Sequence, residues 1–544
     1  MKLFICILVL CNVNYLENLV CGGVLNSNKL FRLDIVHYND FHDRFEETSI
    51  SYPVCKSNDT KCVGGFARLY QEIKTLLQEK PKALLLNAGD VFQGTYWYTL
   101  LKWNITQKFI NMLPNDAHAI GNHEFDDGIV GLAPYLAALK APVVAANIDA
   151  SNEPKLKGLF KPHVIVERDG KKIGIIGLIT PDTAVTSNSE GVIFLDPIKS
   201  VEKEAKFLTE QGIDIIIVLS HCGLEVDKEM ARSVGEHIDI IIGGHSHSLL
   251  WNALDAPSKE VISGPYPVIM GSHSKPEHKV LIVTASAFTK YLGNLTVYFD
   301  NAGELQDYSG QPVFLNRSIP EDPEIKTLLE PYKQELHIKV HEVVGYANEN
   351  FVDKQCGAGE CALGDLAADA YVNATLEMKL NKLPLVSFLM RNMIRGSIPK
   401  GDITRGSIIN TLPFTNKVVS FKLLGKYLVE ALEICMTTYW IKKPFNGPFM
   451  PHISGMKLTL NTTSAKVDSI LVKVGDEFEP LDNDKEYQIS TLKFLLQGGN
   501  GFKVLKEHGY DPIVIGNDAE LLEKYIRKIT PITPTLDNRL VIIE

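Results

Sequence analysis

The sequence has no excess of basic residues, since 65 Asp and Glu outnumber 55 Lys and Arg for a net charge of −10. Binding to a nucleic-acid backbone needs clustered Lys and Arg, so this balance argues against a nucleic-acid polymer as partner. A small anion is still compatible, because a bound metal can supply the positive charge. Internal repeats and low-complexity tracts are also missing, and 45% hydrophobic residues with 22% charged residues is ordinary soluble composition.

Two catalytic signatures are absent as well. The chain contains no Gly-X-Ser-X-Gly segment and no phosphate-cradling loop that ends in Gly-Lys-Ser/Thr. It also lacks an Arg-Gly-Asp tripeptide, the simplest route to integrin binding. These absences point away from serine-hydrolase and P-loop chemistry.

The N-terminus carries only a short apolar run. Lys2 is followed by apolar residues 3–10, which is typical of a signal peptide cleaved near Cys21 to Val24, so we assign residues 1–23 to it. A buried strand or a membrane anchor is the alternative, although a spanning helix needs about 20 apolar residues. Glu544 is not preceded by the apolar tail of a lipid-anchor signal. We therefore expect a secreted, extracellular protein without a membrane anchor.

The cysteines outside this leader fit an oxidising compartment. Cys55 with Cys62, and Cys356 with Cys361, are close enough in sequence to form disulfides that close small loops. The other two, Cys222 and Cys435, are expected to be free, buried thiols. Asn-X-Ser/Thr sequons are compatible with a secreted glycoprotein, and they lie at Asn58, Asn104, Asn294, Asn316, Asn373 and Asn461.

The length of 544 residues predicts two large domains. Apolar runs alternate with loops and helices between residues 28 and 315, which predicts an α/β domain with doubly buried strands. Residues 316–342 are polar, helix-prone and acidic at their start, so we expect a helical linker. Residues 343–544 form the second domain and combine a helix at 363–373 with strands. The strand-like runs of the first domain are residues 83–86, 143–146, 173–177, 213–218 and 238–242.

Five short segments of the first domain contain residues that can bind a metal. One such histidine alone is more often a hydrogen-bonded loop residue. In α/β sheets, however, ligands gather at the carboxyl ends of strands, so five segments in succession are expected to converge on one site. The segments are Asn-Asp-Phe-His (39–42), Ala-Gly-Asp (88–90), Gly-Asn-His-Glu-Phe-Asp (121–126), Ser-His-Cys (220–222) and Gly-Gly-His-Ser-His (243–247).

These residue types suit a pair of divalent cations. Two such ions about 3.5 to 4 Å apart need a shared carboxylate, with imidazole nitrogens and oxygens in the remaining positions. Asp90 is the candidate bridge. The set suits zinc, and also manganese, cobalt, magnesium or calcium. The other predicted ligands are Asp40, His42 and His247 for one ion, and Asn122, His221 and His245 for the second ion.

His123 and Asp126 complete the predicted chemistry. A water acidified by the two ions would attack phosphorus in line. His123 would stabilise the transition state or protonate the leaving oxygen, while Asp126 orients His123 and stabilises its charge. The pattern therefore predicts metal-dependent hydrolysis of a phosphate ester or anhydride.

The motif set resembles the 5′-nucleotidase family, which includes the salivary apyrases of blood-feeding arthropods. The segments that carry the resemblance are 39–42, Gly-Asp-Val-Phe-Gln-Gly at 89–94, 121–126 and 243–247, and the similarity covers nearly the whole mature chain. It implies a calcineurin-like metallophosphoesterase domain with α/β/β/α layers and a C-terminal α/β nucleotide-recognition domain. It also implies zinc as the usual metal and rotation of the domains about the linking helix.

The resemblance also implies how a nucleotide is held. Phe414 in Leu-Pro-Phe and Phe494 in Leu-Lys-Phe match two rings that clamp the base, and Arg395 matches an arginine that holds phosphate. The alternatives are two core phenylalanines and a solvated arginine. Asn500 stands where the family has an aspartate that binds ribose, so it lacks charge-assisted hydrogen bonding.

Two more positions depart from the family pattern. Gly357 stands where a second phosphate-binding arginine is expected, and Met390 where an asparagine is expected. Together with Asn500 they remove a cation and two polar contacts, which amounts to several kcal/mol of binding as an order of magnitude. Arg391 or Asn392 are candidates to replace these groups.

Three functions follow as hypotheses. The first is an apyrase that converts ATP and ADP to AMP and thereby opposes platelet aggregation driven by ADP; the missing anchor favours it. The second is a 5′-nucleotidase that converts AMP to adenosine. The third is a salivary protein of low activity that binds nucleotide or a platelet receptor, motivated by Gly357, Met390 and Asn500.

Overall fold

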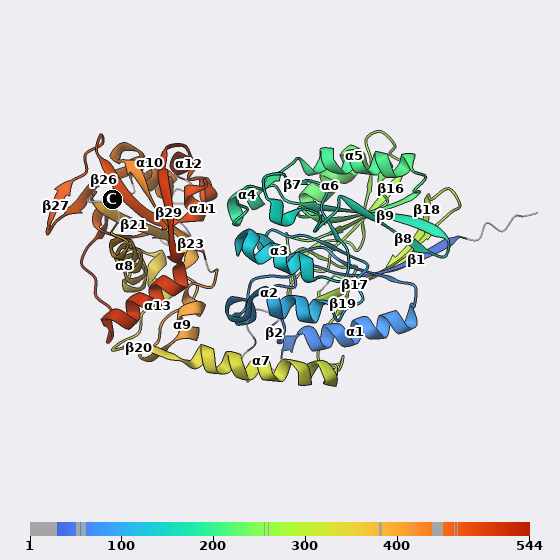
Figure 1. Ribbon diagram of the computed structural model, residues 1–544, viewed down its shortest axis with the longest axis horizontal. Helices are drawn as coiled ribbons and strands as arrows, with labels where there is room; N and C mark the ends of the chain where they lie inside the picture. The colour runs from blue at the N-terminus through green and yellow to red at the C-terminus, as the bar shows by residue number, and fades with distance from the viewer. Residues whose placement is uncertain are drawn as a thin grey trace, which may run out of the picture.

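The computed structural model describes residues 30–49, 55, 61–254, 256–258, 260–379, 383–414, 416–437, 450–461, 463–464 and 466–543. The predicted signal peptide at 1–23 and the sequon at Asn58 lie outside these ranges. The chain forms two bodies side by side, joined along one edge by the long helix α7 (Pro323–His341) (Figure 1). None of the helices in the described part of the chain has the length and hydropathy that a membrane crossing requires.

The N-terminal domain contains two sheets. The first has the strand order β18-β17-β1-β4-β5-β6, in which β1, β4, β5 and β6 are parallel, and the second has the order β15-β16-β12-β11-β9-β8. Four of the five predicted strand runs lie within or overlap long or central strands of these sheets, and the fifth becomes the short edge strand β6. The bounds are β1 (Phe31–Tyr38), β4 (Leu84–Asn87), β5 (Ala117–Ala119), β6 (Val143–Val144), β17 (Tyr291–Phe299), β18 (Leu305–Gly310), β8 (His163–Arg168), β9 (Lys171–Ile179), β11 (Ile215–His221), β12 (Ile240–Gly243), β15 (Val268–Gly271) and β16 (Lys279–Val283).

Helices cover the outer face of each sheet. One core cluster joins the facing sides of the two sheets and continues to α5 (Pro197–Glu210) and α6 (Leu224–Val234). Another lies between the first sheet and α1 (Phe66–Glu79), α2 (Tyr96–Ile110) and α3 (Gly128–Ala138). Helix α5 illustrates the local cause: Asp196 caps it, Pro197 opens it, and its buried residues recur at helical spacing. The predicted α/β/β/α layering is thus confirmed.

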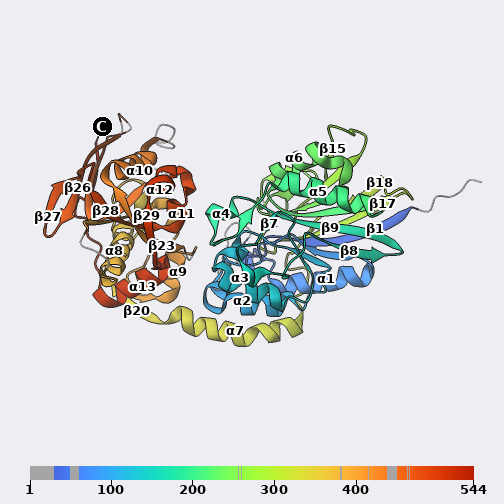
Figure 2. The same cartoon turned by 45° about the horizontal axis from the view of Figure 1, so that its top comes forward.

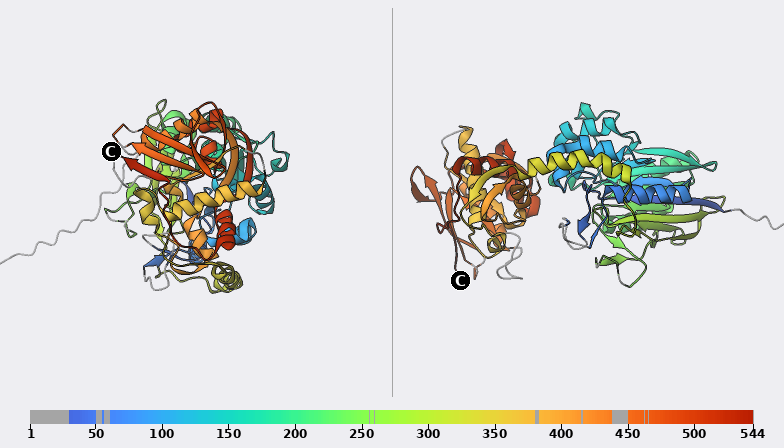
Figure 3. Two further views of the ribbon diagram at one scale, coloured as in Figure 1. Left: turned by 90° about the vertical axis from the view of Figure 1, so that its left-hand side faces the viewer. Right: turned by 90° about the horizontal axis from the view of Figure 1, so that it is seen from below.

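Helix α7 packs against both bodies. The Asp322 carboxylate accepts from the amides of Glu324 and Ile325 and fixes its start. Its buried residues Ile325, Leu329 and Leu336 belong to the core of the N-terminal domain, while its C-terminal end contacts α9 (Arg405–Thr411) of the second body. Figures 2 and 3 show from other sides that α7 reaches from one body to the other. The helix lies inside the range predicted for a helical linker.

The C-terminal domain is a mixed α/β body around a single core cluster. Its five-stranded sheet has the order β24-β21-β28-β23-β29, and a four-stranded sheet has the order β27-β26-β25-β30. Helix α8 (Ala362–Glu377) contains the predicted helix and extends it at both ends. The other elements are β20 (Val343–Ala347), β21 (Leu385–Met390), β22 (Gly401–Thr404), β23 (Lys417–Leu424), β24 (Pro451–Ser454), β25 (Met456–Asn461), β26 (Lys466–Val474), β27 (Glu477–Pro480), β28 (Glu486–Leu492), β29 (Tyr510–Asn517), β30 (Leu540–Ile543), α10 (Gly425–Thr437), α11 (Lys493–Leu496), α12 (Lys503–His508) and α13 (Asp518–Ile529).

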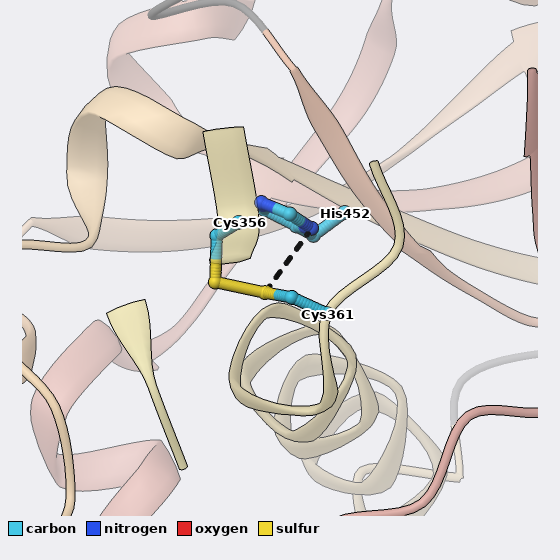
Figure 4. Close-up of side chains that lie close together, drawn as sticks. All are labelled: Cys356, Cys361 and His452. Atoms are coloured by element: carbon cyan, nitrogen blue, oxygen red, sulfur yellow. Dashed lines mark hydrogen bonds between the residues drawn. A yellow bond between two sulfur atoms is a disulfide. The ribbon is translucent and has the colours of Figure 1, made fainter. Parts of the chain in front are cut away.

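All six cysteines outside the predicted leader behave as expected. Cys55 is bonded to Cys62 and Cys356 to Cys361, whereas Cys222 and Cys435 are free and buried. His452 packs against the second disulfide, with its Nδ1 3.9 Å from Cys361 Sγ (Figure 4). This cluster resembles a metal site, but both sulfurs are already consumed in the disulfide, and burial lowers the pKa of His452 to about 3. It is therefore a packing contact in the core.

Candidate active site

The five predicted segments meet at one end of the two sheets of the N-terminal domain. Residues 39–42 follow β1, residues 88–90 follow β4, and residues 121–126 follow β5, three neighbouring parallel strands of the first sheet. His221 ends β11, and residues 244–247 follow β12, which is its parallel neighbour in the second sheet. Since parallel strands present their carboxyl ends at one edge, the topology brings the segments together.

Asp90 lies at the centre of the cluster and is almost fully buried. Its Oδ2 lies 3.0 Å from His221 Nε2 and 3.8 Å from His42 Nε2, and its Oδ1 accepts from the His123 amide at 2.9 Å. Asp90 thus touches residues from both halves of the site, and Asp40, whose carboxylate accepts from the His245 amide at 3.1 Å, does so as well. This is the arrangement expected of a carboxylate that bridges two ions.

The other predicted ligands fall into two groups around Asp90. His247 Nε2 lies 3.2 Å from Asp40 Oδ1 and 3.1 Å from His42 Nε2. On the other side, His221 Nε2 lies 3.3 Å from Asn122 Oδ1, and the rings of His221 and His245 are 5.2 Å apart. All seven predicted ligands are therefore brought together around Asp90, while their division between two ions stays a prediction.

The hydrogen bonds of the imidazoles fit a metal. His221 Nδ1 lies 2.8 Å from the Ala88 carbonyl and His42 Nδ1 lies 3.1 Å from the Phe92 carbonyl, so each Nδ1 carries the hydrogen that it donates. In a neutral imidazole each Nε2 would then present a lone pair to carboxylate or carbonyl oxygens, as a metal ligand does. Lone pairs that face one another repel unless a cation lies among them. A hydrogen bond from Nδ1 to a backbone carbonyl, as in His221 and His42, is typical of histidine that binds a metal through Nε2.

The backbone of the cluster is strained. Asp40, His42, Asp90, His245 and His247 all have positive φ, between 49° and 70°. Residues other than glycine in this region cost about 1 to 3 kcal/mol each, and they persist where the surroundings fix them for function. Five of the seven predicted ligands share this property.

Glu124 holds two of the ligand loops together, a role that the motif did not reveal. Its carboxylate accepts hydrogen bonds from the amides of Gly121, Asp90, Val91 and Phe92. Burial, with the nearby Asp90 charge, raises its pKa to about 7. Glu124 thus fixes the position of Asp90 relative to the segment that carries Asn122 and His123. Its place inside that segment was the only signal in the sequence.

His123 and Asp126 form the predicted pair. His123 Nδ1 lies 2.7 Å from Asp126 Oδ2, and the His123 ring lies 5.1 Å from that of His42. Burial lowers the pKa of His123, but the charges of Asp126 and Asp90 outweigh it and raise the pKa to about 10. The imidazole can therefore carry a proton at its free Nε2.

A pocket that is open to solvent lies between the two domains beside Asp126. Phe414 and Phe494 line it from the C-terminal domain and Asp126 lines it from the N-terminal domain. Phe414 is 37% exposed, so it is not a core residue, whereas Phe494 packs partly against the core. The Arg395 guanidinium lies over the Phe414 ring at 5.2 Å. Asn500 has positive φ, and its buried Nδ2 has no hydrogen-bond partner among the residues that the structure describes.

Comparison with known proteins agrees with this arrangement. The profile of calcineurin-like phosphoesterases matches residues 33–249, and that of the 5′-nucleotidase C-terminal domain matches residues 343–507. An apyrase of Tabanus yao is 41% identical to the chain, over 95% of both proteins. The chain belongs to the 5′-nucleotidase family.

Other members show the same full-length similarity. An apyrase of Anopheles gambiae is 38% identical, over 99% of this chain and 95% of its own length, and a 5′-nucleotidase of Bos taurus is 34% identical, over 96% and 93%. The crystal structure of a 5′-nucleotidase precursor from Thermus thermophilus superimposes with a TM-score of 0.70 at 33% identity, covering 94% of this chain and 99% of its own. As a family member, the chain is a metal-dependent nucleotide phosphohydrolase.

The positions that depart from the family pattern have different surroundings. Met390 is fully buried and its sulfur lies 3.8 Å from Cys435 Sγ, so this side chain faces the core. Arg391 donates to the Ile394 carbonyl at 2.5 Å and lies 3.6 Å from Asp353, and Asn392 Oδ1 is buried without a hydrogen-bond partner. Gly357 is buried beside the Cys356–Cys361 disulfide. Arg391 is thus already engaged within its own domain.

Gly121→Ala tests how closely the ligand loops approach. A Cβ at this position would lie 2.1 Å from Asp90 Oδ1, so Asp90 must move away from the centre of the cluster. We expect kcat/KM to fall about 100-fold, the cost of a displacement of about 1 Å at a catalytic centre. The control is Gly359→Ala, whose Cβ would meet only Ile542 at 3.7 Å. Equal activity of the two variants would contradict the close approach.

Proposed function

We propose that this protein is a secreted apyrase that hydrolyses ATP and ADP to AMP with two divalent metal ions. The observation that carries the proposal is the convergence of the two ligand sets on Asp90, next to a pocket lined by Phe414 and Phe494. Similarity to apyrases of Tabanus yao and Anopheles gambiae supports the choice of substrate. Removal of ADP would inhibit platelet aggregation that depends on it.

Asp90 would bridge the two ions in this proposal. Asp40, His42 and His247 would complete one coordination sphere, and zinc is the metal that their chemistry favours. When bound, two divalent cations activate a water for attack on phosphorus and neutralise negative charge on the phosphate. The residues that would complete the other sphere are Asn122, His221 and His245.

The rest of the reaction falls to groups of the chain itself. His123 would donate the proton of its Nε2 to the leaving phosphate oxygen, while the bond from Nδ1 to Asp126 holds the ring in place. Phe414 and Phe494 would stack on the base, Arg395 would bind phosphate, and Asn500 would bind ribose through its unpartnered amide.

The domain boundaries and the location belong to the same proposal. Residues 28–315 would form the metallophosphoesterase domain, 316–342 the linker and 343–544 the nucleotide-binding domain, after removal of 1–23. The two disulfides support an oxidising, extracellular location. Binding to a platelet receptor is the alternative mode of action, and the His123→Ala variant distinguishes it from hydrolysis.

Phosphate release from ATP, ADP and AMP, with and without a chelator, tests the function. We expect release from ATP and ADP to stop after chelation and to return with zinc, because activation of the attacking water depends on the bound ions. Release from AMP alone would replace the proposal with a 5′-nucleotidase that forms adenosine, which the similarity to the Bos taurus enzyme makes the second candidate. Release that chelation leaves unchanged would contradict both.

A further inference from the structure

The pocket between the domains contains two lysines that the motifs did not assign. Lys417 begins β23 and Lys493 begins α11, and both line the pocket together with Asp126, Phe414 and Phe494. The Lys493 ammonium donates to Asn188 Oδ1 of the other domain, which fixes it at the domain interface. Two cationic side chains from one domain thus border the same space as Asp126 of the other, the carboxylate that pairs with His123.

The positive charge in this pocket is not neutralised by ion pairs. In the part of the chain that the structure describes, neither ammonium has a carboxylate partner, and the bond to Asn188 leaves Lys493 two further donors. Burial lowers the pKa of Lys493, and repulsion from Lys417 adds to the effect while Glu190 opposes it. The Glu190 carboxylate accepts from the Ile129 amide, and that of Asp126 is bonded to His123. An anion that binds between the lysines would relieve their repulsion.

We propose that Lys417 and Lys493 bind an inner phosphate of nucleoside di- and triphosphates and thereby favour ADP and ATP over AMP. The inference rests on the proposed function, since it assumes that the terminal phosphate lies at the metal cluster. The same pocket borders Asp126 and both phenylalanine rings, so a ligand that fills it joins the catalytic pair to the base. In ADP and ATP the connecting group includes an inner phosphate, which AMP lacks.

The test compares ADP and AMP in the full-length, metal-loaded protein. Lys417→Gln and Lys493→Gln should each raise KM for ADP about 10-fold, because each removes one charge-assisted hydrogen bond. In the double variant kcat/KM for ADP should fall about 100-fold, while kcat/KM for AMP stays within about 3-fold. Lys493→Arg should keep most of the ADP activity, because it retains the charge.

Lys422→Gln is the matched control. Lys422 lies on the same strand as Lys417, but its ammonium is 2.8 Å from Asp511 Oδ2, outside the pocket lining. This variant should hydrolyse ADP and AMP like the unmodified protein. An equal loss for ADP and AMP in the double variant, or no loss for either, would overturn the assignment.

A failure of the lysine proposal can be distinguished from a failure of the apyrase proposal. If the unmodified protein cleaves only AMP, the apyrase proposal fails, and ADP is then measured as a competitive inhibitor of AMP hydrolysis. A rise of about 100-fold in the inhibition constant of ADP in the double variant would still support phosphate binding by the lysines. An unchanged inhibition constant would overturn it.

Discussion

Asp90→Asn is expected to abolish phosphate release and to remove bound metal. The carboxylate lies between His42 and His221, so its loss would affect both coordination spheres. A neutral amide of the same size cannot bridge two cations, and we expect kcat/KM for ADP to fall at least about 10⁴-fold, since two-metal chemistry depends on both ions. Metal analysis after dialysis and phosphate release under metal saturation measure the two effects.

The appropriate control is Asp307→Asn. Asp307 is exposed on β18, and its carboxylate accepts only from the Tyr308 amide next to it. Both variants should retain the thermal stability expected of an isosteric change that leaves the core intact. An Asp90→Asn protein that keeps two tightly bound ions and normal turnover would contradict the role of Asp90 as a bridge.

His123→Ala should lower kcat about 10²- to 10⁴-fold with little change in metal content, because a positioned general acid contributes about that much. His123 donates its amide to Asp90 and pairs its ring with Asp126. It forms a third candidate cluster with His42 and Asp90, but it belongs to neither of the two predicted ligand sets. A fall in kcat without loss of metal separates proton donation from metal binding. His237→Ala, a partly buried histidine after α6, is the control.

The same variant decides between an enzyme and a binding protein. If inhibition of platelet aggregation is lost together with turnover, hydrolysis of ADP accounts for the effect. Inhibition that persists in His123→Ala would favour the hypothesis of a salivary protein that acts by binding, which the departures at Gly357, Met390 and Asn500 suggested.

In the C-terminal domain, the sequence did not decide which residues replace the polar groups that the family pattern has near position 390. Met390 and Arg391 end one strand and begin the next turn, and their side chains have opposite surroundings: Met390 packs on Cys435, and Arg391 pairs with Asp353. Met390 is the last residue of β21 and Arg391 is the first residue of the 3-10 turn that follows, so the backbone conformation changes between them. Where the strand ends and which side faces the core depend on the packing of the sheet. The sequence therefore named candidate replacements without deciding which of them faces the nucleotide.

The sequence by itself determined five strand-like runs of the first domain and the residues that follow them, but not the order of the strands in the sheets. It also determined both disulfides and the two free thiols, because these follow from local hydrophobic runs and short spacings. Asp90 could be predicted as a metal ligand for the same reason, because it follows a local apolar run. The assignment of individual ligands to ions stays a prediction.

Only the tertiary structure decided the contacts between distant segments. The four backbone amides that donate to the Glu124 carboxylate come from two separate loops. Lys493 donates to Asn188 across the domain interface, and the two residues are 305 positions apart in the sequence. Such contacts depend on how two sheets pack and how α7 holds the domains, which no local pattern encodes. The chemistry at the strand ends is thus readable from the chain, whereas the pocket that would select the substrate exists only after the two domains have come together.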